Sequence, residues 1–227
     1  MKDSIISAEG LTIGYDGKPL YSDFSFDIGE GDYCFVIGDN GTGKTSLMKT
    51  ILGLVKPLGG RIEIADGTEG KDIGYMPQQT GVQRDFPASV KEIVLTGFAG
   101  KNGLKPFYSR KQRELARTNL DKLGILNLEN RCYRELSGGQ QQRVLLARTL
   151  CAASKIMLLD EPVAGLDPDA TEELYELIAK LNREGMTIIM ISHDIPAARK
   201  YATSVIHIAD KPEFSDAKSY FRAKEEK

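Results

Sequence analysis

The 227-residue sequence predicts an α/β fold whose core is a mostly parallel β-sheet. Two continuous apolar runs, 33–37 and 156–159, have the length and composition of strands that are buried on both faces of a sheet. The later apolar runs alternate with helical patterns, as parallel strands joined by crossover helices require. A stretch from about 90 to 151 carries helical patterns only, which predicts a helical subdomain inserted into the core.

The first third of the chain has the patterns of several strands and of one helix. Residues 5–13 and 20–28 have the pattern of short alternating strands with a turn between them at 15–19, which predicts an antiparallel N-terminal β-subdomain. The buried strand that follows leads into a glycine-rich loop and then a helix, for which Gly53 is a plausible C-cap. Two more short strands are expected at 61–64 and 73–76.

The sequence changes character near Thr80: from about 90 to 151 only helical patterns occur, and strand patterns that alternate with helices return at 156. We expect helices at 109–123, 140–152, 168–183 and 194–202, and strands at 156–159, 187–191 and 204–208. The chain is then one domain, in which 1–79 and 153–227 form the core and 80–152 form the helical subdomain. The last fifteen or so residues are charged, and we expect them to be peripheral.

The charge balance and the cysteines narrow the function classes. The 30 Lys and Arg residues nearly cancel the 32 Asp and Glu residues, so nothing in the composition favours a nucleic-acid-binding surface. Three widely spaced cysteines, Cys34, Cys132 and Cys151, suit reduced thiols in a cytoplasmic protein and form neither a disulfide framework nor a zinc motif. The N-terminus lacks the pattern of a signal peptide, and no apolar run approaches the ~18 residues of a membrane span. We therefore expect a soluble chain whose membrane role comes through a partner.

Residues 38–45 (GDNGTGKT) match the phosphate-binding pattern G-x-x-x-x-G-K-[ST] at every fixed position. They follow a buried strand and open a helix, which is the context in which backbone N–H groups converge on a phosphate. Lys44 supplies a positive charge for the β- and γ-phosphates, and the Thr45 hydroxyl is a natural Mg²⁺ ligand. A chance glycine turn would give this full pattern in only on the order of 1% of chains of this length. The predicted nucleotide-binding residues of this segment are Gly38, Asn40, Gly41, Thr42, Gly43, Lys44, Thr45 and Ser46.

A pair of carboxylates ends the apolar strand at 156–159. In an open parallel sheet, ligands bind beyond the carboxyl ends of the strands, which is also where the 38–45 loop is expected. Because successive residues that leave a strand point in different directions, Asp160 and Glu161 can take separate tasks. We assign Asp160 to the Mg²⁺ shell and Glu161 to the γ-phosphate and its attacking water. The alternative is a solvated acidic pair at a strand end.

Three further side chains are candidates, each with a structural alternative. His193 follows a predicted strand at the same edge of the sheet, but it could instead help to cap the helix that begins near Asp194. The amide of Gln78 could order a water or contact Mg²⁺, or Gln78 could be an ordinary loop residue. Tyr15 could stack on adenine, or it could be a half-buried strand tyrosine.

A second glycine-rich segment, 136–140 (LSGGQ), opens the helix predicted at 140–152. A glycine-rich turn at a helix N-terminus is itself an anion site. We call 38–45 and 136–140 the two phosphate cradles of the chain. A single nucleotide bound to one chain needs only one of them. The second one therefore suggests that the nucleotide is held between two copies of the protein.

Together these segments resemble the ATP-binding-cassette (ABC) ATPases, which are P-loop NTPases with a RecA-like core, and the match covers nearly the whole chain. Residues 38–45 look like Walker A and 156–161 look like Walker B. Residues 136–140 look like the signature, the most specific motif of the family. Residues 164–167 (AGLD) resemble the D-loop, with Gly165 where alanine is more usual.

Single residues match the family as well. Gln78 corresponds to the Q-loop glutamine, Tyr15 to the adenine-stacking aromatic and His193 to the switch histidine. The resemblance implies a head-to-tail homodimer with two ATP molecules at its interface. Each ATP would lie between Walker A of one subunit and three residues of the other, Ser137, Gly138 and Gly139.

The resemblance also implies the chemistry of ATP hydrolysis. Glu161 would be the general base that polarises water, and His193 would contact the γ-phosphate. Gln78 would help to order the catalytic site. The ligands of Mg²⁺ would be Thr45, Gln78 and Asp160.

A shorter resemblance concerns what hydrolysis drives. Residues 75–78 (YMPQ), followed by 85–90 (DFPASV), look most like the zinc- and manganese-import cassettes of bacteria. That likeness implies an integral-membrane permease that docks through the helical subdomain and the Q-loop, and an extracytoplasmic solute-binding protein. The chain would then lie on the inner face of the cell membrane. The alternative is a soluble ABC ATPase without a permease, for example in iron–sulfur cluster assembly, whereas a P-loop kinase would leave 136–140 without a role.

Overall fold

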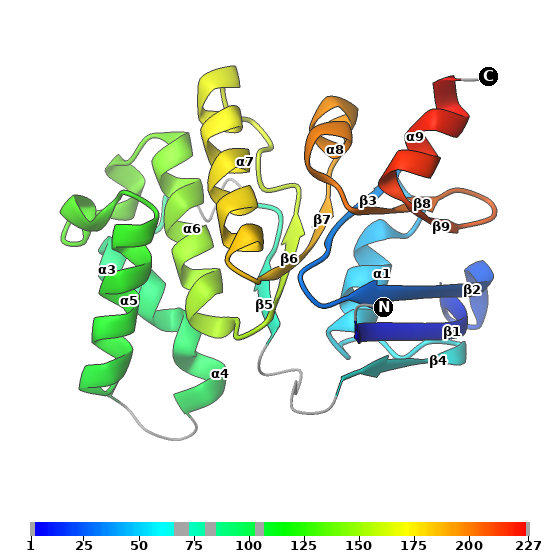
Figure 1. Cartoon of the computed structure of the whole chain (residues 1–227). Helices are drawn as coiled ribbons and strands as arrows, with labels where there is room; N and C mark the ends of the chain where they lie inside the picture. The colour runs from blue at the N-terminus through cyan, green and yellow to red at the C-terminus, as the bar shows by residue number, and fades with distance from the viewer. Residues whose placement is uncertain (1–2, 66–72, 80–84, 103–106, 226–227) are drawn as a thin grey trace. The chain divides into compact units, whose positions relative to one another are not determined.

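The computed structural model describes residues 3–65, 73–79, 85–102 and 107–225, and the chain divides into two compact units. The first unit contains Met1–Gly70 and Asn182–Lys227, and the second contains Lys71–Leu181. Each unit combines strands with helices (Figure 1). The predicted change of character near Thr80 lies outside the described residues.

An antiparallel sheet opens the first unit, with its strands in the order β2-β1-β4 (Figure 1). The strands are β1 (Ser4–Tyr15), β2 (Lys18–Gly29) and β4 (Gly59–Ile64). The β1–β2 hairpin turns at Asp16 and Gly17, which both have positive φ, as the two-residue turns preferred between twisted strands require. The predicted antiparallel N-terminal subdomain is therefore confirmed.

Strand β3 (Tyr33–Gly38) is the centre of the second group of strands in this unit. It pairs in parallel with both β7 (Thr187–Ile191) and β8 (Ser204–Ile208), and β9 (Glu213–Asp216) pairs antiparallel with β8. Every residue of β7 is buried, as its apolar run predicts. The helices of this unit are α1 (Lys44–Ile51), α8 (Ile195–Tyr201) and α9 (Ala217–Glu225).

The C-terminal segment is integrated into the first unit, so the expectation that it is peripheral is wrong. After β9, helix α9 buries Ala217, Tyr220 and Phe221. The ring of His207 in β8 meets that of Tyr220 edge-on at 5.7 Å between centroids. Apolar residues on one side of a short helix are enough to dock it, because the charged residues take the other side.

The second unit places two parallel strands beside a set of helices (Figure 1). The strands are β5 (Ile73–Met76) and β6 (Ile156–Asp160). The α-helices are α3 (Val90–Leu95), α4 (Ala99–Asn102), α5 (Arg110–Lys122), α6 (Gly138–Ala152) and α7 (Pro168–Arg183), the last of which ends just inside the first unit. The 3₁₀ helices are η2 (Thr96–Phe98), η3 (Leu126–Leu128) and η4 (Tyr133–Glu135). Pairing outside the N-terminal sheet is mostly parallel, so the predicted fold class is confirmed.

Local sequence signals fix where several helices begin. Ser89, Ser109 and Ser137 each accept a hydrogen bond from the backbone three residues on. The residue at that third position, Glu or Gln, bonds back to the serine backbone and completes a capping box. Such a box satisfies two N–H groups that would otherwise lack partners at a helix start.

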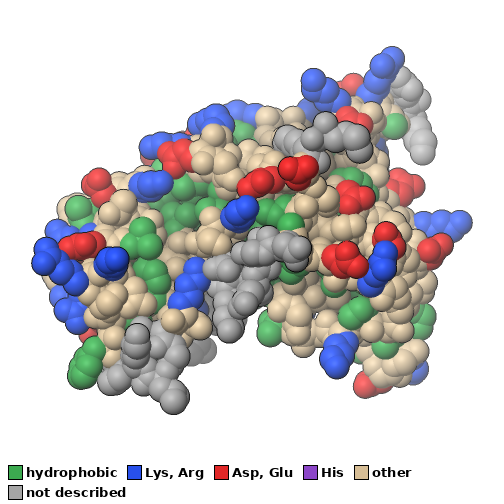
Figure 2. Space-filling view, turned by 60° about the horizontal axis from the view of Figure 1, so that its bottom comes forward, with side chains coloured by type: hydrophobic (Ala, Val, Ile, Leu, Met, Phe, Trp, Pro, Cys, Tyr) green, Lys and Arg blue, Asp and Glu red, His purple; other side chains and the backbone are tan. Residues whose placement is uncertain are grey.

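The face of the molecule drawn in Figure 2 carries charges of both signs. Figure 2 shows Lys and Arg side chains interspersed with Asp and Glu over the visible face. Within the ranges that the structure describes, every helix is too short or too polar to cross a membrane.

Glu161 follows β6 in the left-handed region of backbone space, with φ of 49°. The other described non-glycine residues with positive φ are Asp16 and Asp23, whose short side chains can bond to the local backbone and so tolerate this conformation. Glutamate lacks that compensation, and the proline that follows restricts its backbone further. We therefore place about 1–2 kcal/mol of backbone strain at Glu161.

Replacing Glu161 with Gly should give a more stable protein than replacing it with Ala, by about 1 kcal/mol in the free energy of unfolding. Both variants lose the carboxylate, so the difference between their free energies of unfolding reports the backbone strain alone. Urea unfolding of the two variants measures it. The matched control is the same pair at Glu114, exposed within α5, where the glycine variant should be the less stable. If the glycine variant were the less stable one at Glu161 as well, the backbone of Glu161 would not be strained.

Candidate nucleotide-binding and catalytic site

The 38–45 loop connects β3 to α1, and its backbone is closely packed at both ends. Gly38 has φ of 147°, and a Cβ atom there would lie 2.2 Å from the carbonyl oxygen of Ile208. Gly43 has φ of 104°, and its Cβ would lie 3.0 Å from Cε1 of Tyr21. No larger residue fits either position without moving its neighbours, which explains both glycines physically.

Lys44 is buried within this loop and holds its carbonyl groups. Its Nζ donates to the backbone oxygens of Gly38 at 2.8 Å and Asp39 at 2.7 Å. The Thr42 hydroxyl also donates to the Asp39 oxygen, at 2.9 Å. These bonds hold the curled conformation of the loop.

The loop and the start of α1 offer hydrogen-bond donors to an anion. Among the described residues, none accepts a hydrogen bond from the backbone N–H groups of Asn40, Gly41 or Gly43. Gly43 is also the N-cap of α1 and supplies no side-chain cap, so the helix start is left to a ligand. Thr45 is exposed on the first turn of α1, where its hydroxyl can meet that ligand. The donors and the lysine suit a polyphosphate.

Tyr15 and Ser46 lie together in the first unit. The Tyr15 hydroxyl is 2.9 Å from Oγ of Ser46, and the Tyr15 side chain is 46% exposed. Tyr15 is the last residue of β1, before the hairpin turn. An exposed ring next to the phosphate loop fits the predicted contact with a nucleotide base.

His193 leaves the same sheet edge as the 38–45 loop. Val36 of β3 pairs with Ile191 of β7, and the two parallel strands end side by side. The cap of α8 is Asp194, whose carboxylate accepts from the backbone N–H of Ala197 at 2.9 Å. His193 itself is exposed, so the capping role weighed for it belongs to its neighbour.

The second unit brings Gln78, Asp160 and Glu161 together at the ends of two parallel strands. Strand β5 pairs with β6, so the residues after both strands share one edge. Gln78 donates from Nε2 to Oε2 of Glu161 at 2.8 Å, which leaves the Gln78 carbonyl oxygen as an acceptor or ligand. Burial, together with the charge of Asp160 and the hydrogen bond to it, raises the pKa of Tyr75 to about 12. Tyr75 therefore stays protonated and holds the buried Asp160 carboxylate in place.

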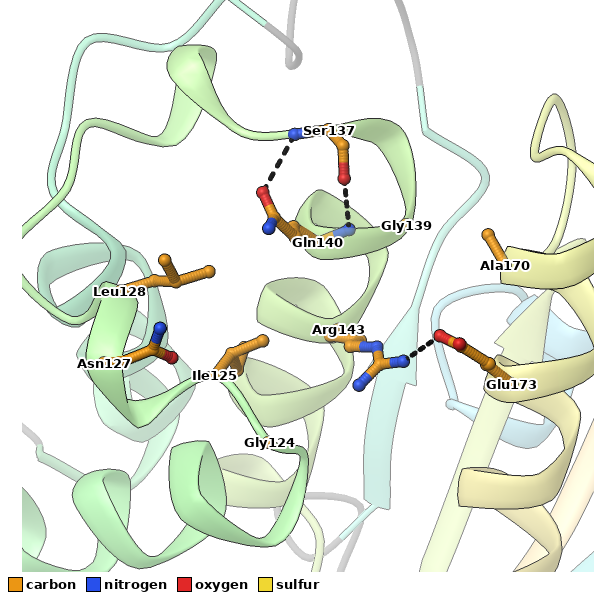
Figure 3. Close-up of a pocket in the computed structure, with 10 residues that line it drawn as sticks. All are labelled: Gly124, Ile125, Asn127, Leu128, Ser137, Gly139, Gln140, Arg143, Ala170 and Glu173. Atoms are coloured by element: carbon orange, nitrogen blue, oxygen red, sulfur yellow. Dashed lines mark hydrogen bonds and ion pairs between the residues drawn. The ribbon is translucent and has the colours of Figure 1, made fainter.

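The predicted second cradle stands at the N-terminus of α6. Ser137 Oγ accepts from the backbone N–H of Gln140 at 3.4 Å, and Gln140 Oε1 accepts from that of Ser137 at 3.1 Å (Figure 3). This capping box uses only an acceptor site of the serine hydroxyl. The hydroxyl proton is still available for a phosphate oxygen.

A cavity of about 320 Å³ adjoins this cradle (Figure 3). Its residues are Gly124, Ile125, Asn127, Leu128, Ser137, Gly139, Gln140, Arg143, Ala170 and Glu173. Arg143 forms an ion pair with Glu173 of α7 and donates to the Leu123 carbonyl oxygen at 3.2 Å. A Cβ on Gly139 would lie 3.1 Å from that of Ala170, so α6 and α7 pack closely beside the cavity.

Some contacts could not be predicted from the sequence. Gln79 donates from Nε2 to the Tyr133 hydroxyl at 2.7 Å, and its Oε1 accepts from the buried Gln142 at 3.4 Å. Gln79 thereby joins the segment after β5 to α6. No local pattern marks Gln79, Tyr75 or Arg143, because each acts on residues far away in sequence.

The residues present fit the two groups that the sequence implies. The loop amides and Lys44 suit the phosphates of a nucleotide. Thr45, Gln78 and Asp160 offer hydroxyl, amide and carboxylate oxygens, which are the ligand types that Mg²⁺ prefers.

Known proteins resemble this chain along most of its length. The family model described as "ABC transporter" matches residues 21–164. The "Manganese transport system ATP-binding protein MntB" of Bacillus subtilis (strain 168) is 40% identical over 86% of this chain and 80% of that protein. The "Zinc uptake system ATP-binding protein ZurA" of Listeria monocytogenes serovar 1/2a (strain ATCC BAA-679 / EGD-e) is 36% identical over 90% of this chain and 82% of that protein.

Solved structures agree. That of cbiO1 from Clostridium perfringens, described as part of the ABC transporter complex cbiONQ, has a TM-score of 0.83 and 29% identity. The match covers 99% of this chain and 93% of that one. These relatives are subunits of transport systems, so a non-transport ATPase is not favoured. The chain belongs to the ABC transporter family, as an ATP-binding subunit that hydrolyses ATP.

Proposed function

We propose that this chain energises the uptake of a transition-metal ion, manganese or zinc, across the cytoplasmic membrane. The observation that carries the proposal is the 36–40% identity to manganese and zinc transport ATP-binding proteins along 86–90% of the chain. The metal is the cargo of the system. We assign its recognition to a membrane permease and an extracytoplasmic solute-binding protein.

The nucleotide is held, in this proposal, by the residues of the first unit. The 38–45 loop and Ser46 bind the phosphates, and Tyr15 stacks on adenine. His193 contacts the γ-phosphate. The support is the packed loop with its unused amides and the exposed Tyr15 ring beside it.

Glu161 is the proposed general base, and Gln78 orients it through the 2.8 Å hydrogen bond. Thr45, Asp160 and Gln78 would hold Mg²⁺, which supplies charge neutralisation for the phosphoryl group. The strained backbone of Glu161 supports the assignment, since strained residues cluster at active sites.

The active site is complete only in a head-to-tail homodimer. Ser137, Gly138 and Gly139 of one copy close over the ATP that the 38–45 loop of the other copy binds. The serine proton that the capping box leaves available supports this role. Chemistry then takes place in a closed space where fixed donors act most strongly on the transferred phosphoryl group.

The permease contact is assigned to a mostly apolar hollow of about 320 Å³ in the second unit. Phe86, 56% exposed, lines it together with Ile93 and Tyr133. Tyr133 accepts a hydrogen bond from Gln79, and the neighbouring Gln78 donates one to Glu161. A partner bound in this hollow could therefore affect the position of Glu161 through these residues. This docking would place the chain on the inner face of the membrane.

We also propose that the chain is one cassette domain, in which 1–79 and 153–227 form the core and 80–152 form the helical subdomain.

Glu161→Gln should still bind ATP but hydrolyse it at least ~10²-fold more slowly, because the amide cannot accept a proton from water. With hydrolysis blocked, the variant should accumulate as an ATP-bound dimer. ATPase assays and light scattering with ATP measure both effects. Glu114→Gln, the same change on the exposed face of α5, is the control and should behave as the wild type. A monomeric Glu161→Gln protein with normal turnover would refute the assignment.

The transport proposal is tested by coexpression with the proposed membrane permease, in cells that lack their own manganese and zinc uptake. Radioactive manganese or zinc should accumulate with the wild-type chain and not with Glu161→Gln. Uptake of neither metal, with the complex assembled and its ATPase active, would reject a metal cargo while leaving the ATPase role intact.

A further inference from the structure

Tyr15, the residue proposed to stack on adenine (the adenine platform), is held at its hydroxyl as well as at its backbone. Tyr15 sits where the β1–β2 hairpin turns, and it pairs with Lys18 across the tight Asp16–Gly17 turn. Its ring is half exposed, but its hydroxyl is not left to water. That hydroxyl lies 2.9 Å from Oγ of Ser46, 31 residues further along the chain.

Ser46 belongs to the first turn of α1, directly after the 38–45 loop. The residue is buried, at 7% exposure, so its hydroxyl lies in a fixed place. Either of the two hydroxyls could be the donor in their hydrogen bond. A serine hydroxyl can donate one hydrogen bond while it accepts another.

The hairpin touches the loop at a second point. A Cβ on Gly43 would lie 3.0 Å from Tyr21 and 3.2 Å from Leu20, which both belong to β2. Tyr21 is 4% exposed, and its ring meets that of Phe24 edge-on. The hairpin therefore rests on the phosphate loop through packing as well as through the Tyr15–Ser46 bond.

We propose that Ser46 is a positioning residue for base recognition: it anchors Tyr15, so that the phosphate loop sets the orientation of the ring that stacks on adenine. The inference rests on the proposed role of Tyr15 as the adenine-stacking residue. A ring held at both its backbone and its hydroxyl loses little freedom when the base arrives, which favours binding.

The anchor also links the two ends of the nucleotide. When Ser46 donates its proton to a phosphate oxygen, it can only accept from Tyr15. A bound phosphate thus fixes the direction of the Tyr15–Ser46 bond and holds the ring more firmly. Base and phosphates then bind cooperatively through one hydroxyl pair.

A double-mutant cycle tests the anchor. The proteins are wild type, Tyr15→Phe, Ser46→Ala and the double variant, and calorimetry gives the Kd of each for ATP and for inorganic tripolyphosphate. Tyr15→Phe keeps the ring and loses the hydroxyl, so it should weaken ATP binding roughly three- to tenfold in the Ser46 background. It should have no effect on ATP binding in the S46A background, where the anchor is already gone.

Tripolyphosphate separates the base from the phosphates. Ser46→Ala should weaken its binding if Ser46 contacts phosphate, whereas Tyr15→Phe should change it much less than it changes ATP binding. An equal loss of ATP affinity from Tyr15→Phe in both backgrounds, or no loss in either, would overturn the anchor.

Tyr15→Ala separates failure of the inference from failure of the proposed role of Tyr15. If Tyr15→Ala weakens ATP binding and Tyr15→Phe does not, Tyr15 stacks on the base without an anchor, and only this inference fails. If Tyr15→Ala leaves ATP binding unchanged in a folded protein, Tyr15 is not the adenine platform, and both fail.

Discussion

The backbone of the 38–45 loop lies between neighbours that leave no room for side chains at either end. Ile208 of β8 approaches Gly38, and the hairpin residues Leu20 and Tyr21 approach Gly43. The buried Lys44 ties the loop carbonyls from within. The parallel strands, the antiparallel hairpin and the start of α1 therefore all depend on one tightly packed turn. This packing restricts the loop backbone that carries the amide donors.

In the proposed function, the two units of the chain supply different residues. The first would supply the phosphate loop, Tyr15 and His193, and the second would supply the carboxylates and the 136–140 segment. Within the second unit, hydrogen bonds connect these functional segments. Gln78 reaches Glu161, and Gln79 reaches both Tyr133 and Gln142 of α6. A shift of α6 would thus move Gln79, which is next to the glutamine that contacts the proposed general base.

The sequence predicts those parts of the fold that short-range patterns encode. Buried apolar runs give β3, β6 and β7, and the glycine pattern gives the loop after β3. The packing of the C-terminal segment is harder to predict, because the apolar residues of α9, Tyr220 and Phe221, lie among charged ones. The contacts of Tyr75 with Asp160 and of Tyr15 with Ser46 join residues far apart in sequence, which no local pattern encodes. The left-handed backbone of Glu161 runs against the preference of its residue type, so no propensity could predict it.

We propose that each ATP is enclosed by two copies of the chain. Lys44→Ala damages the phosphate loop, and Ser137→Arg blocks the cradle that serves the partner's ATP. Each variant alone should be inactive, but a mixed dimer of the two contains one site with an intact loop and an intact cradle. The ATPase rate of the mixture therefore shows whether the site is shared between two copies. We predict hydrolysis in the mixture that neither variant shows alone. A mixture as inactive as its components, with mixed dimers shown to form, would contradict the shared site.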